Sequence, residues 1–197
     1  MHSKSVEKLL KDSGAFLHGH FQLSSGLHSD AYVQCMRALV HPDITMQLAH
    51  LIADIFKDSA VDVVCGPAMG GITLAFATAH ILNTKAIFSE YTKSSDGTKT
   101  IFLKRGFEHD VAGKRVLIVE DAITTGKAVR ETLVVLRKHF AEVVGISAII
   151  NRAQSDITFD NVPFKPLMSM ALTTYEPYHC PLCRSGVPVT IPGSRQQ

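Results

Sequence analysis

Residues 115–133 read RVLIVEDAITTGKAVRETL, and the fold class follows from this stretch. An apolar run ends in Glu120 and Asp121, as is typical of a buried parallel strand whose carboxyl end lies at a site. A helix is then predicted over 127–138, because apolar side chains recur at helical spacing at Val129, Leu133, Leu136 and Phe140. Residues 120–126 are therefore predicted to form a strand-to-helix turn, whose free backbone N–H groups favour an anion.

Strands and helices alternate along the rest of the chain. Further helices are predicted over 4–12, 43–59 and 72–82, the first ending near Gly14 and the second capped by Asp43. Strands are predicted within 61–71, 85–90 and 142–151. Residues 101–110 are expected to return as a further strand after a loop or hairpin tip at 91–100. Residues 14–35 mix aromatic, β-branched and turn-forming residues, which favours an extended hairpin.

This order of elements predicts an α/β fold with a doubly wound central parallel sheet and a small N-terminal hood formed by the hairpin region. Strands that end near residues 65, 120 and 150 would bring their following loops to one edge of the sheet, where such sheets bind ligands. We expect one domain over residues 1–197. Within it, residues 1–40 would form the hood, 41–155 the core and 156–197 a C-terminal extension.

The composition limits the kinds of partner. A chain of 197 residues with 46% hydrophobic content can build one good-sized core. Twenty Lys and Arg against eighteen Asp and Glu give a net charge of +2, which argues against a general nucleic-acid binder. The sequence has no apolar run long enough for a transmembrane helix, and residues 1–14 lack the apolar core of a signal peptide. A cytoplasmic enzyme is the default expectation.

The loop after the acid pair predicts a ligand with two kinds of polar group. Residues 124–128 offer successive backbone donors and two threonine hydroxyls at a helix start, which suits a phosphate monoester. Glu120 and Asp121 lie too early in the chain to bind the same phosphate, but they can accept hydrogen bonds from hydroxyl groups a sugar's width away. A phosphorylated ribose carries both features.

Two other phosphate-binding motifs do not fit this loop. A Walker A loop needs glycine where the chain has Asp121, and Ser or Thr where it has Ala128. A dinucleotide-binding fingerprint needs three glycines after the strand, and this loop has only Gly126. Two adjacent acids directly after a buried strand are also an uncommon arrangement for simple solvated caps.

The segment VLIVEDAITTGKA, residues 116–128, resembles the phosphoribosyl diphosphate (PRPP) binding motif of the type I phosphoribosyltransferase family. The orotate-using branch of that family is similar to this chain over residues 14–35, 66–72, 105–126 and 180–195, which extends the resemblance to nearly the whole chain. The resemblance implies an enzyme that joins orotate to PRPP and releases diphosphate in the synthesis of UMP. It also implies Mg²⁺ chelated by the diphosphate and a homodimer, while the charge and the apolar pattern predict no nucleic-acid or membrane partner.

The resemblance also implies roles for individual residues. Glu120 and Asp121 would hold the ribose hydroxyls, residues 124–128 the 5′-phosphate, and Gly66, Pro67 and Ala68 the diphosphate. The full PRPP-binding set is expected to be Gly66, Pro67, Ala68, Glu120, Asp121, Ala122, Ile123, Thr124, Thr125, Gly126, Lys127 and Ala128. Orotate is expected to contact Ser25, Gly26, Thr124 and Arg152. The Arg152 guanidinium would form a bidentate pair with the orotate carboxylate.

Catalytic roles are expected for Lys104, Arg105 and Asp121, although the chain departs here from the better-known branch of the family. Ser24 stands where that branch has a lysine, and Met69 and Gly70 stand where it has Tyr-Lys. Its lysine-rich catalytic loop is replaced by residues 90–108, where the cations that could meet the diphosphate are Lys93, Lys99, Lys104 and Arg105. The sequence LKRGF, residues 103–107, favours the last two, and a solvated basic hairpin is the alternative.

Two other functions stay open. The chain could be a phosphoribosyltransferase for a purine base, but a neutral purine has no carboxylate for Arg152. It could be a PRPP-sensing regulator that binds RNA or DNA, but the balanced charge and the lack of spare length disfavour that function. At the level of single residues, Arg152 could be an exposed surface arginine, and Gly66–Ala68 could be only a sharp connection.

The cysteines fall into two pairs. Cys35 and Cys65 lie in apolar surroundings and are expected to be buried small hydrophobes. Cys180 and Cys183 form a lone Cys-x-x-Cys with only His179 nearby in the sequence, whereas a closed zinc site needs about four ligands. A structural tail is the favoured interpretation, and zinc binding or redox chemistry is the alternative.

Overall fold

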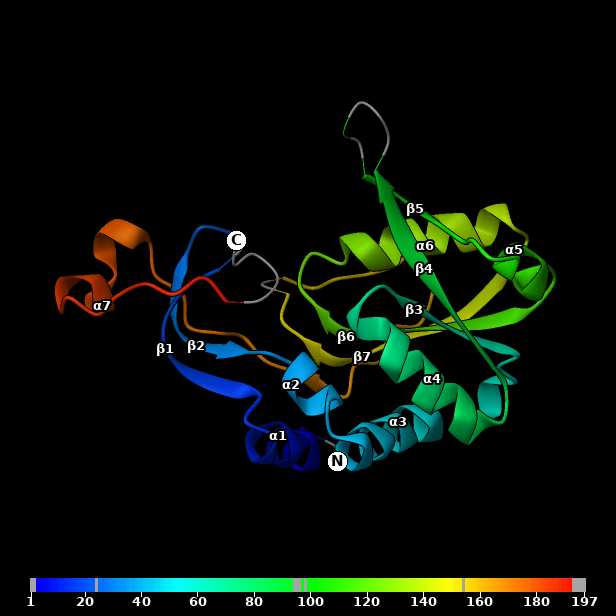
Figure 1. Cartoon of the computed structure of the whole chain (residues 1–197), viewed down its shortest axis with the longest axis horizontal. Coiled ribbons are helices and arrows are strands. Elements are labelled where there is room, and N and C mark those ends of the chain that lie inside the picture. The colour runs from blue at the N-terminus through cyan, green and yellow to red at the C-terminus, as the bar shows by residue number, and fades with distance from the viewer. Residues whose placement is uncertain (1–2, 24, 94–96, 98, 154, 193–197) are drawn as a thin grey trace.

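The computed structural model describes residues 3–23, 25–93, 97, 99–153 and 155–192 (Figure 1). Its main sheet has six strands in the order β5-β4-β3-β6-β7-β8. These are β3 (Val63–Pro67), β4 (Lys85–Lys93), β5 (Lys99–Phe102), β6 (Arg115–Ile123), β7 (Glu142–Asn151) and β8 (Met168–Ser169). All neighbours pair in parallel except β5, which runs antiparallel to β4 at one edge.

Helices cover both faces of this sheet. One face packs against α1 (Ser3–Asp12), α2 (Met36–Leu39), α3 (Pro42–Phe56) and α4 (Gly70–Leu82), and the other against α5 (Phe107–Val111) and α6 (Lys127–Lys138). Figure 1 shows α3 and α4 below strands β3, β6 and β7, and α5 and α6 above these three strands. The strands supply both cores because successive side chains point to opposite faces, with Leu117 in the lower core and Val116 and Ile118 in the upper one. The predicted doubly wound α/β fold is confirmed.

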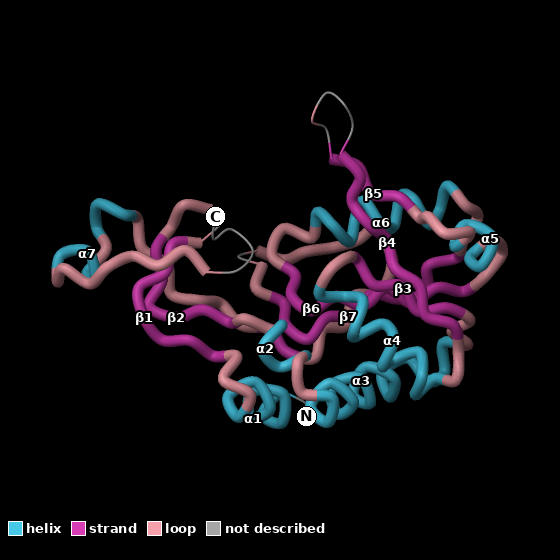
Figure 2. Tube along the Cα trace, in the orientation of Figure 1, coloured by secondary structure: helices cyan, strands magenta, loops and turns pink. Residues whose placement is uncertain are grey.

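A separate two-stranded sheet lies beside the main one. It is an antiparallel hairpin of β1 (Phe16–Gln22) and β2 (His28–Val33), as the sequence predicts. The C-terminal segment, with the 3-10 helix η2 (Pro177–His179) and the short helix α7 (Pro181–Arg184), lies alongside this hairpin (Figure 2). His28 and Tyr175 exchange backbone hydrogen bonds, and the N–H of Gln22 donates to the carbonyl oxygen of Thr190 at 2.9 Å. The hairpin and the C-terminal segment therefore form one unit.

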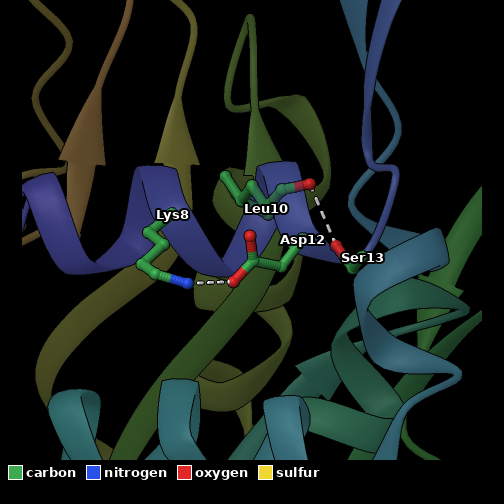
Figure 3. Close-up of polar contacts among 4 residues, drawn as sticks. All are labelled: Lys8, Leu10, Asp12 and Ser13. Carbon is green, nitrogen blue, oxygen red and sulfur yellow. Dashed lines mark hydrogen bonds and ion pairs between the residues drawn. The ribbon is translucent and has the colours of Figure 1, made fainter.

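The N-terminal helix is anchored by its apolar face. Val6 and Leu10 are fully buried, and the Ser13 hydroxyl donates to the carbonyl oxygen of Leu10 at 3.0 Å where the helix ends (Figure 3). The Lys8–Asp12 ion pair in the same view lies on the exposed face, where such pairs contribute about 0–1 kcal/mol. Among the described residues, none of the helices is long and apolar enough to cross a membrane.

Several predicted boundaries are wrong in detail. Residues 120–123 belong to β6 rather than to the turn, because β7 is long enough to pair with them. The N-cap of α3 is His41 and not Asp43, since Pro42 takes the first helical position, where a missing N–H is tolerated.

The ends of three other predicted elements also differ. Phe140 is expected on the apolar face of α6 but is 82% exposed, because α6 ends at Lys138 and Phe140 turns the chain with φ +60°. Residues 107–111 form α5 instead of continuing a strand. The short 3-10 helix η1 (Lys57–Ser59) ends the region predicted as one helix over 43–59.

Candidate functional site

The site lies where the connections of the sheet reverse direction. From β3 the chain passes through α4 to β4 on one side, and from β6 it passes through α6 to β7 on the other. The carboxyl ends of β3 and β6 are therefore neighbours whose following helices diverge. Such a switch point opens a crevice for ligands in doubly wound sheets.

The acid pair lies at the end of β6. Glu120 is only 8% exposed, and its Oε1 accepts a hydrogen bond from the N–H of Asp121 at 3.0 Å. Burial raises the pKa of the Glu120 carboxyl well above its usual range, and the neighbouring charge of Asp121 raises this pKa further. Asp121 Oδ1 in turn accepts from the N–H of Ala122 at 2.8 Å. The two adjacent carboxyls thus differ in environment.

Asp121 also touches the loop that follows β3. A methyl group on Gly70 would lie 2.6 Å from either carboxylate oxygen of Asp121, so a side chain there would displace this carboxylate. Gly66 and Pro67 end β3 as buried residues, and the N–H of Ala68 donates to the carbonyl oxygen of Ser89 at 2.8 Å. The predicted diphosphate loop and the acid pair are therefore in contact through Gly70.

The turn from β6 into α6 forms a small cavity of about 230 Å³. Its lining includes Glu120, Tyr91 and every residue from 122 to 129. Gly126 adopts φ +72°, and a methyl group there would lie 2.6 Å from Ile157 Cδ1, so the turn requires glycine. The threonine hydroxyls and the first N–H groups of α6 face a space suited to a phosphate group.

A larger cavity of about 540 Å³ adjoins the turn and shares Thr124 and Thr125 with it. Ser25 and Tyr32 reach it from the hairpin, and Arg152 from the end of β7. The Arg152 Nε is buried and has no hydrogen-bond partner among the described residues. The cavity thus joins a phosphate-sized turn to a positively charged guanidinium group.

Some predicted site residues lie elsewhere. Gly26 shapes the hairpin turn with φ +86° and does not line either of the two cavities, in the part of the chain that the structure describes. The same holds for Lys104, which is exposed, and for Arg105, which pairs with Glu90 and lies over the Phe88 ring, 5.1 Å from its centroid. Ser24 lies outside the described residues.

Tyr32 and Arg130 are among the cavity residues that sequence reasoning missed. Tyr32 lies under Arg152, and Arg130 lines the cavity from the first turn of α6. Arg130 follows Gly126 by four residues, so helical spacing from the predicted turn could have indicated it. Tyr32 carried no such signal, because its contact depends on how the hairpin folds over the sheet.

The doubly wound sheet, the acid pair and the N–H-lined turn define a class of α/β proteins that bind a phosphorylated sugar at the switch point. The family model for the phosphoribosyl transferase domain matches residues 38–164, and the chain belongs to this family. It is 40% identical over 197 residues to a protein of Caldicellulosiruptor bescii named orotate phosphoribosyltransferase, covering 100% of both chains. A protein of the same name from Thermotoga maritima is 38% identical over 190 residues, covering 96% of this chain and 98% of that protein.

Solved structures show the same fold at lower identity. The orotate phosphoribosyltransferase of Aeropyrum pernix superposes with a TM-score of 0.68 at 22% identity, covering 84% of this chain and 93% of that one. That of Mycobacterium tuberculosis H37Rv, solved with Fe(III) dicitrate, gives 0.66 at 23% identity over 86% and 97%. An adenine phosphoribosyltransferase from Rhodothermus marinus also gives 0.66, at 19% identity over 85% and 100%, so the fold does not select the base.

Proposed function

We propose that this chain transfers the phosphoribosyl group of PRPP to N1 of orotate, giving orotidine 5′-monophosphate and diphosphate in pyrimidine biosynthesis. The observation that carries the proposal is Arg152, whose cationic guanidinium is stacked on Tyr32 at the cavity that adjoins the phosphate-sized turn. A carboxylate-bearing base satisfies this group with charge-assisted hydrogen bonds. The full-length relatives named for orotate support the same base.

PRPP would bind along the crevice from the turn to the loop after β3. The 5′-phosphate would accept hydrogen bonds from Thr124, Thr125 and the N–H groups at residues 126–128, at the positive end of α6. Glu120 and Asp121 would accept hydrogen bonds from the ribose hydroxyls. Gly66–Ala68 would face the diphosphate, with Gly70 holding this loop against Asp121.

Orotate would occupy the larger cavity. Arg152 would hold its carboxylate, and Ser25 and Thr124 line the same cavity and can bond to the ring. Gly26 would act through the shape of the hairpin turn. This arrangement would fix the base nitrogen toward C1 of the ribose, because both ends of the reacting pair are held by directional hydrogen bonds.

The proposed reaction depends on positioning of the substrates and on electrostatic stabilisation of the transition state, rather than on covalent catalysis. As the bond between C1 and the diphosphate breaks, positive charge develops on the ribose and negative charge on the leaving group. Asp121 would lie on the ribose side of that separation. Lys104 and Arg105 would meet the diphosphate, and Arg105 must first leave Glu90 to do so. Groups that are held ready for this charge lower the barrier.

Mg²⁺ is the proposed cofactor, and the residues at the site fit it. Magnesium prefers oxygen ligands and keeps several waters, and the Asp121 carboxylate offers oxygens beside the proposed diphosphate loop. Bound to the diphosphate, the ion would offset negative charge on the leaving group. The purine-base alternative gains no support from this cavity, because it leaves the Arg152 guanidinium without a carboxylate.

We also propose that residues 1–40, 41–155 and 156–197 act as hood, core and C-terminal extension of one domain that works as a homodimer. The larger cavity has walls from all three segments, including Tyr32, Arg152 and Leu172. Val40 and Phe76 are 69% and 70% exposed, and a second copy would cover them. Light scattering of the purified chain tests this, and a mass of one 21.5 kDa chain would contradict it.

The activity is tested by incubating the chain with PRPP, Mg²⁺ and each of orotate, adenine, hypoxanthine and uracil, and following base absorbance. We expect consumption of orotate alone, with diphosphate released in equal amount. Uracil matches orotate except for the carboxylate, so it is the matched control for Arg152. Consumption of a purine without orotate would overturn the proposal.

A further inference from the structure

The hairpin and the C-terminal segment bring together four side chains that the proposed reaction does not use. His20 and His28 come from β1 and β2, and Cys180 and Cys183 from the start and the body of α7. One nitrogen or sulfur atom from each lies within 4.8 Å of every other. His20, His28 and Cys180 are buried, and Cys183 lies at the surface. We propose that these four residues form a tetrahedral Cys₂His₂ site for a structural zinc ion.

The distances between these atoms fit a shared metal. Zinc binds sulfur at about 2.3 Å and nitrogen at about 2.0–2.1 Å, so tetrahedral ligand atoms lie roughly 3.3–3.8 Å apart. Cys180 Sγ is 3.4 Å and Cys183 Sγ 3.7 Å from His20 Nε2. Cys183 Sγ is 3.3 Å from His28 Nδ1, while the two histidine nitrogens lie somewhat closer, at 2.8 Å. The remaining pairs, Cys180–Cys183 and Cys180–His28, lie within 4.8 Å, so small side-chain shifts would bring all four atoms to a shared ion.

The ring of His20 is already oriented as that of a zinc ligand. Its Nδ1 lies 2.7 Å from the carbonyl oxygen of Val187, and because a carbonyl only accepts, Nδ1 carries the proton. This leaves the Nε2 lone pair directed at the two sulfurs and at His28. Metal-bound histidines commonly use their second nitrogen in this way, which fixes the ring and the tautomer.

The donor set selects the metal. Two thiolates and two imidazoles suit zinc, whereas Mg²⁺ prefers oxygen ligands and would not compete for this site. Two thiolates also balance the charge of the ion, which matters where three of the ligands are buried. Four protein ligands close the coordination sphere, so the ion would be structural rather than catalytic. A redox-active Cys-x-x-Cys is the rival, but it gives no role to two buried imidazoles.

The zinc ion would link the hairpin to the C-terminal segment, and both of these segments line the proposed orotate cavity. Gln22 and Tyr32 line that cavity from the hairpin, and Leu172, Thr174 and Pro192 line it from the C-terminal segment. Backbone hydrogen bonds already join the two segments at His20–Thr190 and His28–Tyr175, on either side of the cluster. Only His179 is near the cysteines in sequence, yet it is exposed and is not one of the four.

Metal analysis of the untagged full chain tests the proposal. After growth with added zinc, we expect about one zinc per chain by inductively coupled plasma mass spectrometry. His28→Ala and Cys183→Ala should lose it, whereas His18→Ala, in the same hairpin, and His179→Ala, next to Cys180, should keep it. A wild-type chain without bound metal, or equal loss in the two control variants, would overturn the site.

A second measurement needs no variant. With Co²⁺ in place of zinc, the wild-type chain should show thiolate-to-metal charge transfer and the strong visible bands of tetrahedral cobalt. Removal of the metal by a chelator should then make Cys180 and Cys183 accessible to alkylation. It should also speed hydrogen exchange at the backbone amides of Gln22 and His28, while exchange at the amides of β6 and β7 stays unchanged. A disulfide between the two cysteines in the native protein would refute the proposal in favour of redox chemistry. Thiols that react equally with and without chelator would refute it in favour of a cluster that binds no metal.

Discussion

The guanidinium of Arg152 lies over the ring of Tyr32, with its Cζ 4.9 Å from the ring centroid. Arg152 follows β7 in the core, and Tyr32 belongs to β2 in the hairpin, so this stack joins two segments that are distant in the chain. The N–H of Arg152 also donates to the carbonyl oxygen of Ile123 at 2.7 Å, which ties the arginine to the end of β6. Both contacts hold Arg152 at the wall of the cavity.

Replacing Arg152 should therefore affect orotate more than PRPP. Hydrogen bonds to a charged group contribute about 1.5–3 kcal/mol, so Arg152→Ala should raise the KM for orotate about 10- to 150-fold. Arg152→Lys keeps the charge but loses the planar fork and the stack, and it should recover only part of this loss. Steady-state kinetics with each substrate varied in turn measure both constants. The surface residue Arg137, which pairs with Asp160, supplies a control in Arg137→Ala, and an equal rise in the KM for PRPP would count against the assignment.

Asp121→Asn should lower PRPP turnover by at least about tenfold, because a neutral amide cannot stabilise charge that develops on the ribose. The amide can keep the hydrogen bond from the N–H of Ala122, so the backbone should stay in place. Stopped assays with saturating orotate measure the rate, and circular dichroism checks the fold. Asp160→Asn, on the surface near α6, is the matched control. A rate near that of the wild type would remove Asp121 from the catalytic set.

The parts of the fold that the sequence predicts are those with local causes. Strand β6 and helix α6 follow from apolar periodicity within one segment, and β7 ends at the predicted residue 151 for the same reason. Phe140 shows where periodicity fails, because the helical spacing continues past the residue at which the chain turns. A backbone reversal depends on local conformation that a pattern of apolar residues does not report.

The features that the sequence did not predict depend on contacts between segments that are distant in the chain. Cys180 and His20 are 160 positions apart, so no spacing rule could join them. In the sequence, His179 is the only histidine near the two cysteines, whereas in the structure the histidines beside them come from the hairpin. In the same way, the pairing of Arg105 with Glu90 depends on the antiparallel register of β4 and β5, which the sequence leaves open.

The burial of Glu120 predicts a pH-dependent stability. Its carboxyl has a pKa that burial and the charge of Asp121 raise well above the usual value. The folded chain therefore holds a proton that the unfolded chain releases, over the pH range between the unfolded pKa, about 4.3, and the raised folded one. Through that range the free energy of unfolding falls as pH rises.

Glu120→Gln removes this titration and keeps an oxygen that can accept from the N–H of Asp121. Relative to the wild type, the variant should gain stability from pH 4 to pH 8 while it loses PRPP turnover. Denaturant melts at several pH values measure the difference, with Glu142→Gln, at the exposed start of β7, as a control that should show a smaller change. A constant difference across this range would show that the Glu120 carboxyl titrates normally.

Lys104 and Arg105 should act on the leaving diphosphate, although neither lines the two cavities in the described part of the chain. Arg105 is paired with Glu90 and stacked on Phe88, so it must exchange these contacts for the diphosphate as PRPP binds. Removing one donor that meets developing charge lowers kcat about 100-fold or more. We expect losses of this order in Lys104→Ala and Arg105→Ala, with smaller changes in the KM for PRPP. Lys114→Ala, at the amino end of β6 and away from the switch point, should stay within about twofold of the wild type. If both loop variants keep more than half of the wild-type kcat, the basic hairpin is only a solvated surface, and another group must meet the diphosphate.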